Sequence, residues 1–490
     1  MEKTVMQAHE QFNDLLEYAT IGSAGSEIHD AEFGIFRRLL GLGRTLLEVF
    51  VASSGRCDLG PTVQDQDGRA YEYRRSSSRQ YLSIFGQISI RRAHYLREGM
   101  KGIFPLDARL NLPKGKYSYL LQDWLTDHAV QTTFGHSVRW MKKVLGLEIP
   151  HRAVQRINLD STETVSEFID SLESPAVEEE GSILVHSADC KGIRMCKKHR
   201  NPDVPRTPEK PGKKRMACVT RGYSTDPYER SPQEIMDSFL ESPENRTSGK
   251  DKQRKDRKPR HRRTIASLKE TKSDLFSKSD RAVKPRMHEG TQDRAALMDG
   301  EKALWNLSAK HFPGWTEILD FTHVVERLRL TAELLCKPGS PEAKEYVRET
   351  GVALLEGHLD WVIEDFTTAM EDGSLSSGKA HTLQHKVIGY FKNNSHRMAY
   401  DQYLARGLPI ATGIIESTCG NLVKDRMEGA GMSWSIDGAE AMIRLRGVFI
   451  DELWEDFWDF RTDREKKRLY AQYTNTMLNR PKQAEMREAA

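Results

Sequence analysis

The chain has 490 residues, of which 38% are apolar and 30% are charged. This length suggests about three domains of ordinary size. No apolar run reaches the roughly 18–20 residues that a membrane-spanning helix needs, and the start of the chain, Met1-Glu2-Lys3, lacks the apolar core of a secretory signal. We therefore expect a globular cytoplasmic protein with no membrane partner.

The cysteines are few and widely spaced. There are six, and no two of them form a C-x-x-C pair. This spacing excludes the usual disulfide scaffold and the usual cysteine-rich zinc site. The six are Cys57, Cys190, Cys196, Cys218, Cys336 and Cys419.

The net charge of +3 conceals two strongly basic stretches. Residues 191–220 carry 10 Lys and Arg against 2 acids, and residues 241–290 carry 16 against 8, so the rest of the chain has a net charge of −13. Basic segments on an otherwise acidic protein indicate a polyanionic partner, with nucleic acid the first candidate. A solvated linker without a partner explains the same charge pattern equally well.

The N-terminal part combines helices with a small β module. Apolar residues recur every three or four positions between Glu32 and Leu47, so residues 1–58 are predicted to be helical. Residues 59–112 are predicted to form a module around a β-hairpin that turns near Gly86.

Residues 113–180 return to a helical pattern. Two apolar stripes, the second ending at Gly146, are followed by a turn and a further helix that begins near His151. The polar side of that helix carries Arg152, Gln155 and Arg156, which is typical of a DNA-reading helix-turn-helix. An ordinary helical bundle gives the same pattern.

From residue 181 onwards, short apolar runs typical of strands alternate with helices. Several of these runs end in an acidic residue, which indicates an α/β fold with a site along one edge of a sheet. From Val324 to the C-terminus, helices dominate. The predicted strands are residues 182–189, 216–223, 264–268, 294–300 and 317–320.

Three acids stand out by their context. Asp189 and Asp299 each end a predicted strand, and Glu416 lies among apolar residues at the predicted start of a helix. Carboxylates suit magnesium or manganese, and acids from two strands and a helix can hold two cations for attack on a phosphodiester. Each aspartate alone is explained as well by a helix N-cap.

One block of the sequence runs from Arg397 to Arg446 and includes Gly407-Leu408-Pro409, Ile414-Ile415-Glu416-Ser417 and Gly431-Met432-Ser433-Trp434. This block is the strongest of several that resemble the ISKra-type family of bacterial insertion-sequence transposases. Asp189-Cys190-Lys191-Gly192 resembles the family's Asp-Gly-Lys-Gly, with Cys190 as a departure, and the segments around Asp299 and Asp320 resemble its middle blocks. The likeness covers roughly residues 80–485.

The resemblance implies a ribonuclease H-like mixed sheet with a DDE triad and divalent metal. The catalytic core would comprise residues 181–323 and 411–450, interrupted by a helical insertion at 324–410 and followed by a helical tail at 451–490. Relatives often carry paired cysteines near positions 57 and 97–100. Only Cys57 is present here, so we expect no zinc.

Asp299 and Asp320 compete for the place of the second acid. Three strands, a helix and a strand are predicted between Asp189 and Asp299, which is the order expected before the second acid of such a core. Asp320 instead begins an Asp-x-x-His motif with His323, which resembles a motif of Mutator-like relatives. We therefore assign Asp299 to the metal and give Asp320 and His323 supporting roles. A buried, hydrogen-bonded core histidine is the alternative for His323.

Together these features predict a DNA transposase that uses Mg²⁺ or Mn²⁺. Asp189, Asp299 and Glu416 would be the catalytic metal ligands. Such a protein would bind element ends and target DNA in the prokaryotic nucleoid, and we expect a homo-oligomer. Two rivals stay open: a transposase-derived DNA-binding protein and a structure-specific nuclease. Besides the helix-turn-helix residues, the expected phosphate-binding residues are Lys191, Lys424 and Arg426.

Two further aromatic positions are assigned to the core. Trp361, within the predicted helical insertion, and Trp434, near the expected third acid, are interpreted as packing residues. The alternative for each is stacking on a DNA base.

Overall fold

The computed structural model describes residues 1–199, 213–240, 259–288, 293–372, 375–411, 420–429 and 431–478. The chain divides into two compact units. One comprises Met1–Ser161 and Glu455–Ala490, and the other comprises Thr162–Trp454. The narrower domain limits expected from the sequence stay predictions. Over the described ranges, no helix is both long and apolar enough to cross a membrane.

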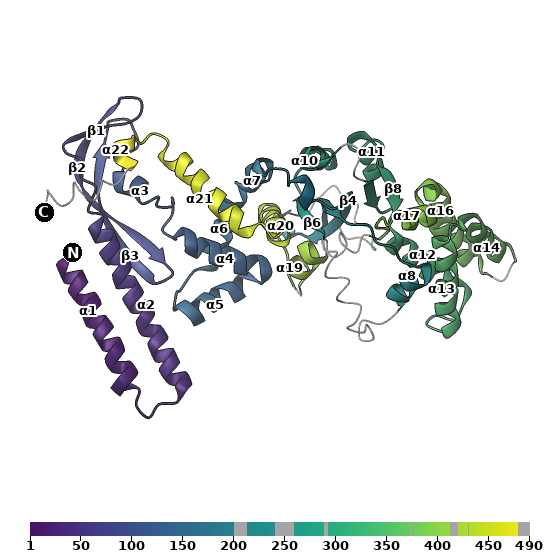
Figure 1. The fold of residues 1–490 in the computed structure, drawn as a ribbon, viewed down its shortest axis with the longest axis horizontal. Helices are drawn as coiled ribbons and strands as arrows, with labels where there is room; N and C mark the ends of the chain where they lie inside the picture. Colours follow the sequence, from purple (N-terminus) through teal and green to yellow (C-terminus); the bar gives the residue numbers. More distant parts are fainter. Residues whose placement is uncertain are drawn as a thin grey trace. The chain divides into compact units, whose positions relative to one another are not determined.

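The first unit begins with a helical hairpin (Figure 1), in which α1 (Glu2–Glu17) runs beside α2 (Ile28–Ser53). A three-stranded antiparallel sheet follows, in the order β1 (Thr62–Gln64), β2 (Ala70–Ser83) and β3 (Gly86–Leu96). The predicted turn at Gly86 is confirmed, because Gly86 has φ 121° and pairs with Ser83. The strands extend well beyond the predicted hairpin.

The rest of the first unit is helical. Ser118 and Thr133 cap the N-termini of α4 and α5 by accepting backbone N–H groups, and Gly146 ends α5 in a left-handed conformation with φ 72°. Tyr470 and Tyr473, from the far end of the chain, pack with Val63 and Tyr71 in one core. The helices are α3 (Pro105–Arg109), α4 (Tyr119–Gln131), α5 (Phe134–Leu145), α6 (His151–Thr162), α21 (Trp454–Tyr470) and α22 (Asn475–Leu478).

The second unit is built on a mixed five-stranded sheet in the order β6-β5-β4-β7-β8. β5 pairs antiparallel with both β4 and β6, whereas β7 pairs parallel with both β4 and β8. The fold class is therefore mixed α/β, and each predicted strand is present. The strands are β4 (Ile183–Arg194), β5 (Lys214–Thr225), β6 (Arg260–Ser267), β7 (Asp293–Met298) and β8 (Thr316–Leu319).

Both faces of this sheet are covered, which explains the continuous apolar runs of its central strands. Ile183 and Val185 of β4 face one core, and Leu184 and Ala188 face the other, as the two-residue period of a strand requires. Helices α10 (Lys272–Val283) and α11 (Lys302–His311) contribute to the second core.

The first core is closed by a group of helices that follows β8. These are α12 (Phe321–Leu335), α13 (Pro341–Leu355), α14 (Leu359–Glu371), α15 (Ser377–Leu383), α16 (Gly389–Asn394) and α17 (Tyr400–Ala405). The helix α8 (Pro232–Leu240) joins them, in a stretch between two predicted strands where no helix was predicted. The unit also contains α7 (Val165–Ser171), α19 (Asp425–Met427) and α20 (Ile436–Ile450).

Candidate active site

Three aspartates lie in a row where the parallel strands meet. Ala188 of β4 pairs with Met298 of β7, and Met298 pairs with Leu319 of β8. The residue after each of these three is an aspartate: Asp299 and Asp320 directly follow β7 and β8, whereas Asp189 lies within β4. The prediction that Asp189 ends its strand is therefore wrong, because β4 continues to Arg194 in its pairing with β5. The parallel register of the three strands still brings the acids together.

Asp189 and Asp299 are both partly exposed. An Asp189 carboxylate oxygen accepts the backbone N–H of Cys190 at 2.6 Å, and an Asp299 carboxylate oxygen accepts that of Glu301 at 2.9 Å. Burial raises the pKa of Asp299, and the charge of Asp189 raises it further, against opposing effects of the Glu301 hydrogen bond and of His323. The two carboxylates are therefore close enough to repel each other.

Asp320 has different surroundings, because it is fully buried. It caps α12 by accepting the N–H of Thr322 at 3.0 Å, and its own N–H donates to the Met298 carbonyl at 2.9 Å. This position favours a structural or supporting role over direct contact with a ligand.

His323 lies in the first turn of α12, with its side chain 28% exposed. Its Nδ1 lies 3.0 Å from a Glu326 oxygen, and its Nε2 lies 3.8 Å from an Asp320 oxygen. Burial alone would lower the pKa of His323, but the hydrogen bond to Glu326 and the charges of Asp320 and Asp299 raise it. The histidine therefore carries positive charge toward the acids more readily than a free histidine does.

Two residues near the acids were missed by the sequence analysis. The ring of Tyr390, on α16, lies against Gly300, where a Cβ atom would come within 2.4 Å of the tyrosine Cε2. The Arg327 guanidinium carbon is 4.9 Å from the centroid of that ring. Burial raises the pKa of Tyr390, and the charge of Asp299 adds to the shift. Arg327 follows His323 by four residues, so the sequence could have placed both side chains on the same face of the helix. No sequence pattern pointed to Tyr390.

The third expected acid, Glu416, lies outside the described residues. The described chain before it lies beside the acid row at Ile410, whose carbonyl accepts the N–H of Phe321, next to Asp320, at 2.9 Å. Within the described ranges, no three His, Cys, Asp or Glu side chains gather closely enough to hold a metal ion by themselves.

The three expected phosphate-binding residues of the second unit differ in their exposure to solvent. Lys191 is partly exposed on β4, and Lys424 is exposed. Arg426 is only 3% exposed and lies over the Trp434 ring, 5.0 Å from its centroid, which does not favour the expected contact with DNA. Burial lowers the pKa of Arg426 to about 10.

Of the two tryptophans that the sequence assigned to the core, Trp434 is buried and Trp361 is exposed. Trp434 is 8% exposed, and its Nε1 donates to the Met427 carbonyl at 3.1 Å, so packing is confirmed. Trp361 is 55% exposed on α14, so the assignment to the core is wrong for this residue. Its neighbour Val362 and the later Phe366 are fully buried instead, because the buried stripe of α14 passes beside Trp361.

In the first unit, Arg152, Gln155 and Arg156 are all exposed on α6. Ala153, Val154 and Ile157, on the other side of the same helix, are buried in a core with residues of α4 and α5. This leaves the polar side of α6 available, as DNA reading by a helix-turn-helix would require.

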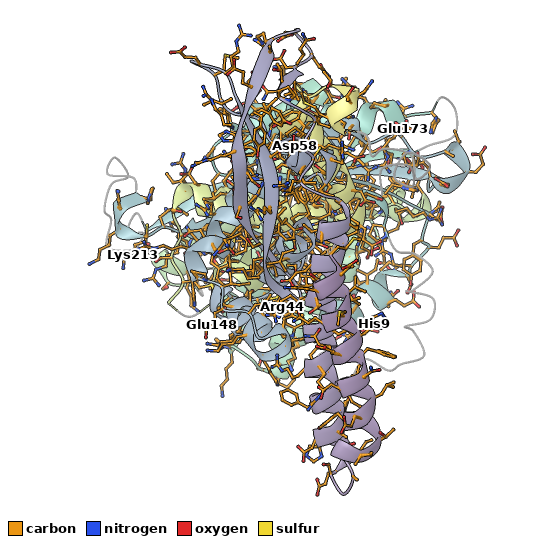
Figure 2. The ribbon with its side chains drawn as sticks, turned by 90° about the vertical axis from the view of Figure 1, so that its left-hand side faces the viewer. His9, Arg44, Asp58, Glu148, Glu173 and Lys213 are labelled. Carbon is orange, nitrogen blue, oxygen red and sulfur yellow. The ribbon has the colours of Figure 1, made fainter. Side chains whose placement is uncertain are left out.

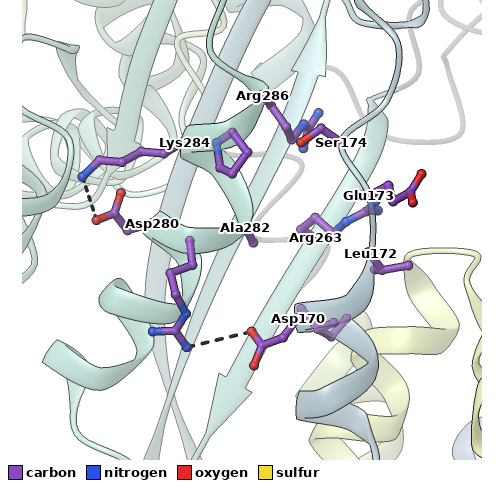
Figure 3. Close-up of a pocket in the computed structure, with 12 residues that line it drawn as sticks. Asp170, Leu172, Glu173, Ser174, Arg263, Asp280, Ala282, Lys284 and Arg286 are labelled. Atoms are coloured by element: carbon purple, nitrogen blue, oxygen red, sulfur yellow. Dashed lines mark hydrogen bonds and ion pairs between the residues drawn. The ribbon is translucent and has the colours of Figure 1, made fainter.

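The second unit also contains a pocket of about 600 Å³ (Figure 3). None of the three aspartates of the acid row lines this pocket. Its walls come from α7, α10 and the segments that follow them, and charges of both signs line it. Arg281 pairs with Asp170 at 3.9 Å, and Lys284 pairs with Asp280 at 2.8 Å. These charges are largely paired within the wall, so the pocket offers little to an ionic ligand.

No family model matches the chain. The UPF0236 protein in the vanSb 3′ region of Streptococcus gallolyticus is 30% identical over 118 residues, which are 24% of this chain and 25% of that protein. The chain thus matches about a quarter of the length of this curated relative.

Among solved structures, the chain is similar to the Drosophila P element transposase strand transfer complex. The alignment covers 77% of this chain and 87% of that chain, with 9% sequence identity and a TM-score of 0.27. An alignment at that TM-score does not establish a shared fold.

Proposed function

We propose that the protein is a DNA transposase of an insertion sequence, with a ribonuclease H-like catalytic core. It would cut the ends of its element by metal-dependent phosphodiester hydrolysis and join the resulting 3′-hydroxyl to target DNA. The proposal starts from the sequence blocks that resemble ISKra-type transposases. The element order supports it, because β4, β5, β6, α10 and β7 precede Asp299 in the expected sequence, with α8 as an addition between β5 and β6.

One observation carries the proposal. Asp189 and Asp299 follow paired residues of two neighbouring parallel strands, and the charge of Asp189 contributes to the raised pKa of Asp299. Two adjacent carboxylates that repel each other are unfavourable for the fold by themselves. A divalent cation between them removes that repulsion, and oxygen ligands suit Mg²⁺ or Mn²⁺.

The donor set therefore fits a divalent metal, with Asp189, Asp299 and Glu416 as the residues that would hold it. When bound in pairs, such cations supply Lewis acids that activate water and stabilise the leaving oxygen. The chain's own groups position these ligands: the Glu301 N–H orients the Asp299 carboxylate, and Asp320 fixes the start of α12 and so the place of His323. Lys191 and Lys424 would contact phosphates.

The experiment combines purified protein, Mg²⁺ and DNA that carries the terminal sequence of the element encoding it. Denaturing gels would score both nicking and joining. We expect Asp189→Asn to abolish both while DNA binding stays within about twofold, because a carboxamide has nearly the same size but is a poor cation ligand. Asp360→Asn is the matched control, since Asp360 is exposed on α14.

The outcomes separate the proposal from its rivals. Cleavage by Asp189→Asn at the wild-type rate rules out the proposed triad. Nicking without joining by the wild-type protein supports a structure-specific nuclease instead. Binding of terminal DNA with no cleavage at any Mg²⁺ or Mn²⁺ concentration supports a transposase-derived DNA-binding protein.

A further inference from the structure

Two cysteines lie directly opposite each other on neighbouring strands of the second unit. Cys190 of β4 pairs with Cys218 of β5 in the antiparallel register. Both side chains lie on the same face of the sheet, because both pack into the core that contains Leu275 and Phe276 of α10. Both are free thiols. Cys190 is also the departure from the Asp-Gly-Lys-Gly pattern, so the proposed function leaves its thiol without a role.

The spacing of the two strands suits a disulfide. Residues directly opposite in an antiparallel pair have Cα atoms about 4.5 or 5.5 Å apart, and a disulfide joins residues whose Cα atoms are about 4.4–6.8 Å apart. The side chains are also directed toward one another, since Cys190 and Cys218 share a side-chain hydrogen bond. The two sulfur atoms can therefore join without a change in strand register.

The two thiols differ in their access to solvent. Cys218 is 5% exposed, whereas Cys190 is partly exposed. The pair lies four residues from the end of the β4–β5 ladder, where Arg194 pairs with Lys214. Figure 2 labels Lys213, the residue just before β5, with its side chain directed outward. A small oxidant can therefore reach Cys190 first, and Cys218 lies behind it as a buried second thiol.

We propose that Cys190 and Cys218 form a reversible cross-strand disulfide when hydrogen peroxide reaches the site. The Cys190 sulfur attacks one peroxide oxygen, the O–O bond breaks, and the thiol proton leaves with the other oxygen as water, which leaves a sulfenic acid. The Cys218 sulfur then attacks the Cys190 sulfur. The S–S bond forms, the S–O bond breaks, and the hydroxyl group leaves with the Cys218 proton as a second water. The two thiols together lose two electrons, which reduce the peroxide.

Closure of the disulfide moves the backbone beside Asp189. A disulfide needs Cβ atoms about 3.5–4.5 Å apart, whereas opposite residues of a ladder have Cβ atoms about 4.5–5.5 Å apart. The strands must therefore approach by about 1 Å at Cys190. The Cys190 N–H, which donates to the Asp189 carboxylate at 2.6 Å, moves with them.

The effect on activity rests on the proposed function, whereas the disulfide itself does not. A displacement of about 1 Å in an active site can cost about 100-fold in rate. We therefore expect the oxidised protein to nick DNA at least about tenfold more slowly than the reduced protein. Dithiothreitol should restore the rate, because exchange with a dithiol reopens the disulfide.

The first measurement is a peptide map of the full chain after treatment of the folded protein with hydrogen peroxide. Free thiols are alkylated, and the protein is digested without reductant. We expect one linked pair of peptides, containing Cys190 and Cys218 with two hydrogens lost, which dithiothreitol separates. Cys190→Ser should abolish this species. Cys336→Ser is the matched control, since it removes a partly exposed thiol that packs against the other core and should leave the link intact.

The second measurement compares Mg²⁺-dependent nicking by the reduced and oxidised proteins. Cys190→Ser should nick at the rate of the reduced wild type with and without peroxide, and Cys190→Ala replaces it if the serine variant does not fold. Nicking that is unchanged when the link is complete overturns the effect on Asp189. A reduced wild-type protein that does not nick contradicts the proposed function, whereas the peptide map alone decides the disulfide.

The peptide map overturns the disulfide in either of two ways. Oxidation of Cys190 to a sulfinic acid without a link to Cys218 shows that the second thiol does not reach the first. A link from Cys190 to any other cysteine shows that the cross-strand pair is not the preferred partner.

Discussion

Asp299 and Asp320 follow residues that pair across β7 and β8, yet one carboxyl is partly exposed and the other is completely buried. The charge of Asp189 contributes to the raised pKa of Asp299. A direct ligand of a catalytic metal is irreplaceable, whereas loss of a group that only supports the ligands costs about 10–100-fold in activity. The two aspartates can therefore be told apart by substitution.

We expect Asp299→Ala to be inactive in nicking at any Mg²⁺ or Mn²⁺ concentration. Asp320→Asn and His323→Ala should keep weak, measurable nicking in gel assays. Asparagine is preferable to alanine at position 320 because it also caps a helix, so the N-terminus of α12 keeps its hydrogen bond. A folded Asp320→Asn protein that is inactive, beside an Asp299→Ala protein that still cuts, would reverse the two roles.

The buried ion pair of Glu180 and Arg286 governs a different property, the acid stability of the second unit. Both side chains are 1% exposed, and two hydrogen bonds of 2.7 and 2.8 Å join them. Burial alone would raise the pKa of Glu180, but the hydrogen bonds from Arg286 and Ser224 outweigh it and lower the pKa. Because the folded-state pKa lies below the unfolded one, the stabilisation is present above about pH 4.3 and is lost as the pH falls through the folded value.

We therefore expect Glu180→Gln to reduce the free energy of unfolding by about 3 kcal/mol at pH 7, since Arg286 would keep an unpaired buried charge. Urea titrations at pH 7, 5 and 3 would measure the difference from wild type, which should shrink toward the acid end. Asp360→Asn, at an exposed acid, serves as the control at each pH. The same deficit at pH 7 and pH 3 would contradict the assigned role of the ion pair.

At the scale of elements, the start of β6 determines how much of the basic stretch 241–290 can be replaced without disturbing the sheet. Arg260, on β6, donates to an Asp226 oxygen at 2.6 Å and to the Glu180 carbonyl at 3.4 Å. The residues from 260 onwards therefore belong to the sheet. A test of DNA binding by this stretch has to stop before β6 and replace residues 244–258 alone.

We expect replacement of residues 244–258 by a Gly/Ser linker of equal length to flatten the salt dependence of DNA affinity. Each phosphate contact that is lost should lower the slope of log K against log salt by about 0.9. Fluorescence anisotropy at several salt concentrations measures that slope, and melting checks that the sheet is retained. An unchanged slope would identify the stretch as a solvated linker.

The elements that the sequence predicted best are the strands whose two faces are both buried. The apolar runs of β4 and β7 pack into two cores, so continuous hydrophobicity was a sufficient signal. The first half of β2 is mostly exposed and rich in Arg and Ser, so the sequence showed no apolar alternation there. The helix α8 was not predicted, because its formation depends on the packing of Ile235 and Met236 against the later helices.

The candidate site was predictable where an acid directly follows a strand, as Asp299 and Asp320 follow β7 and β8. Asp189 was predicted on the correct strand but at its end, whereas β4 continues to Arg194. Tyr390 reaches Gly300 only through the folding of a long helical segment, and the burial of Arg426 against Trp434 depends on a loop conformation; neither leaves a local pattern. Glu416 stays a prediction.

At the scale of the whole molecule, the first unit is assembled from both ends of the chain, whereas the second is continuous. Contact between the distant ends is extensive: Tyr470 donates to the Leu112 carbonyl at 2.5 Å, and the Phe104 N–H donates to the Tyr473 hydroxyl at 3.1 Å. Bringing together residues so far apart in sequence has a high entropic cost unless the intervening chain is already compact.

This arrangement fixes an order of events during protein synthesis. The ribosome releases residues 1–161 first, then the whole second unit, and only afterwards Tyr470, Tyr473 and Met477, which complete the core around Val63 and Tyr71. A nascent chain thus has every residue of the Asp189–Asp299–Asp320 row before its first unit can close. Chains cut short before residue 470 would carry the acids without the finished N-terminal core, so translation to the far end acts as the last step of folding.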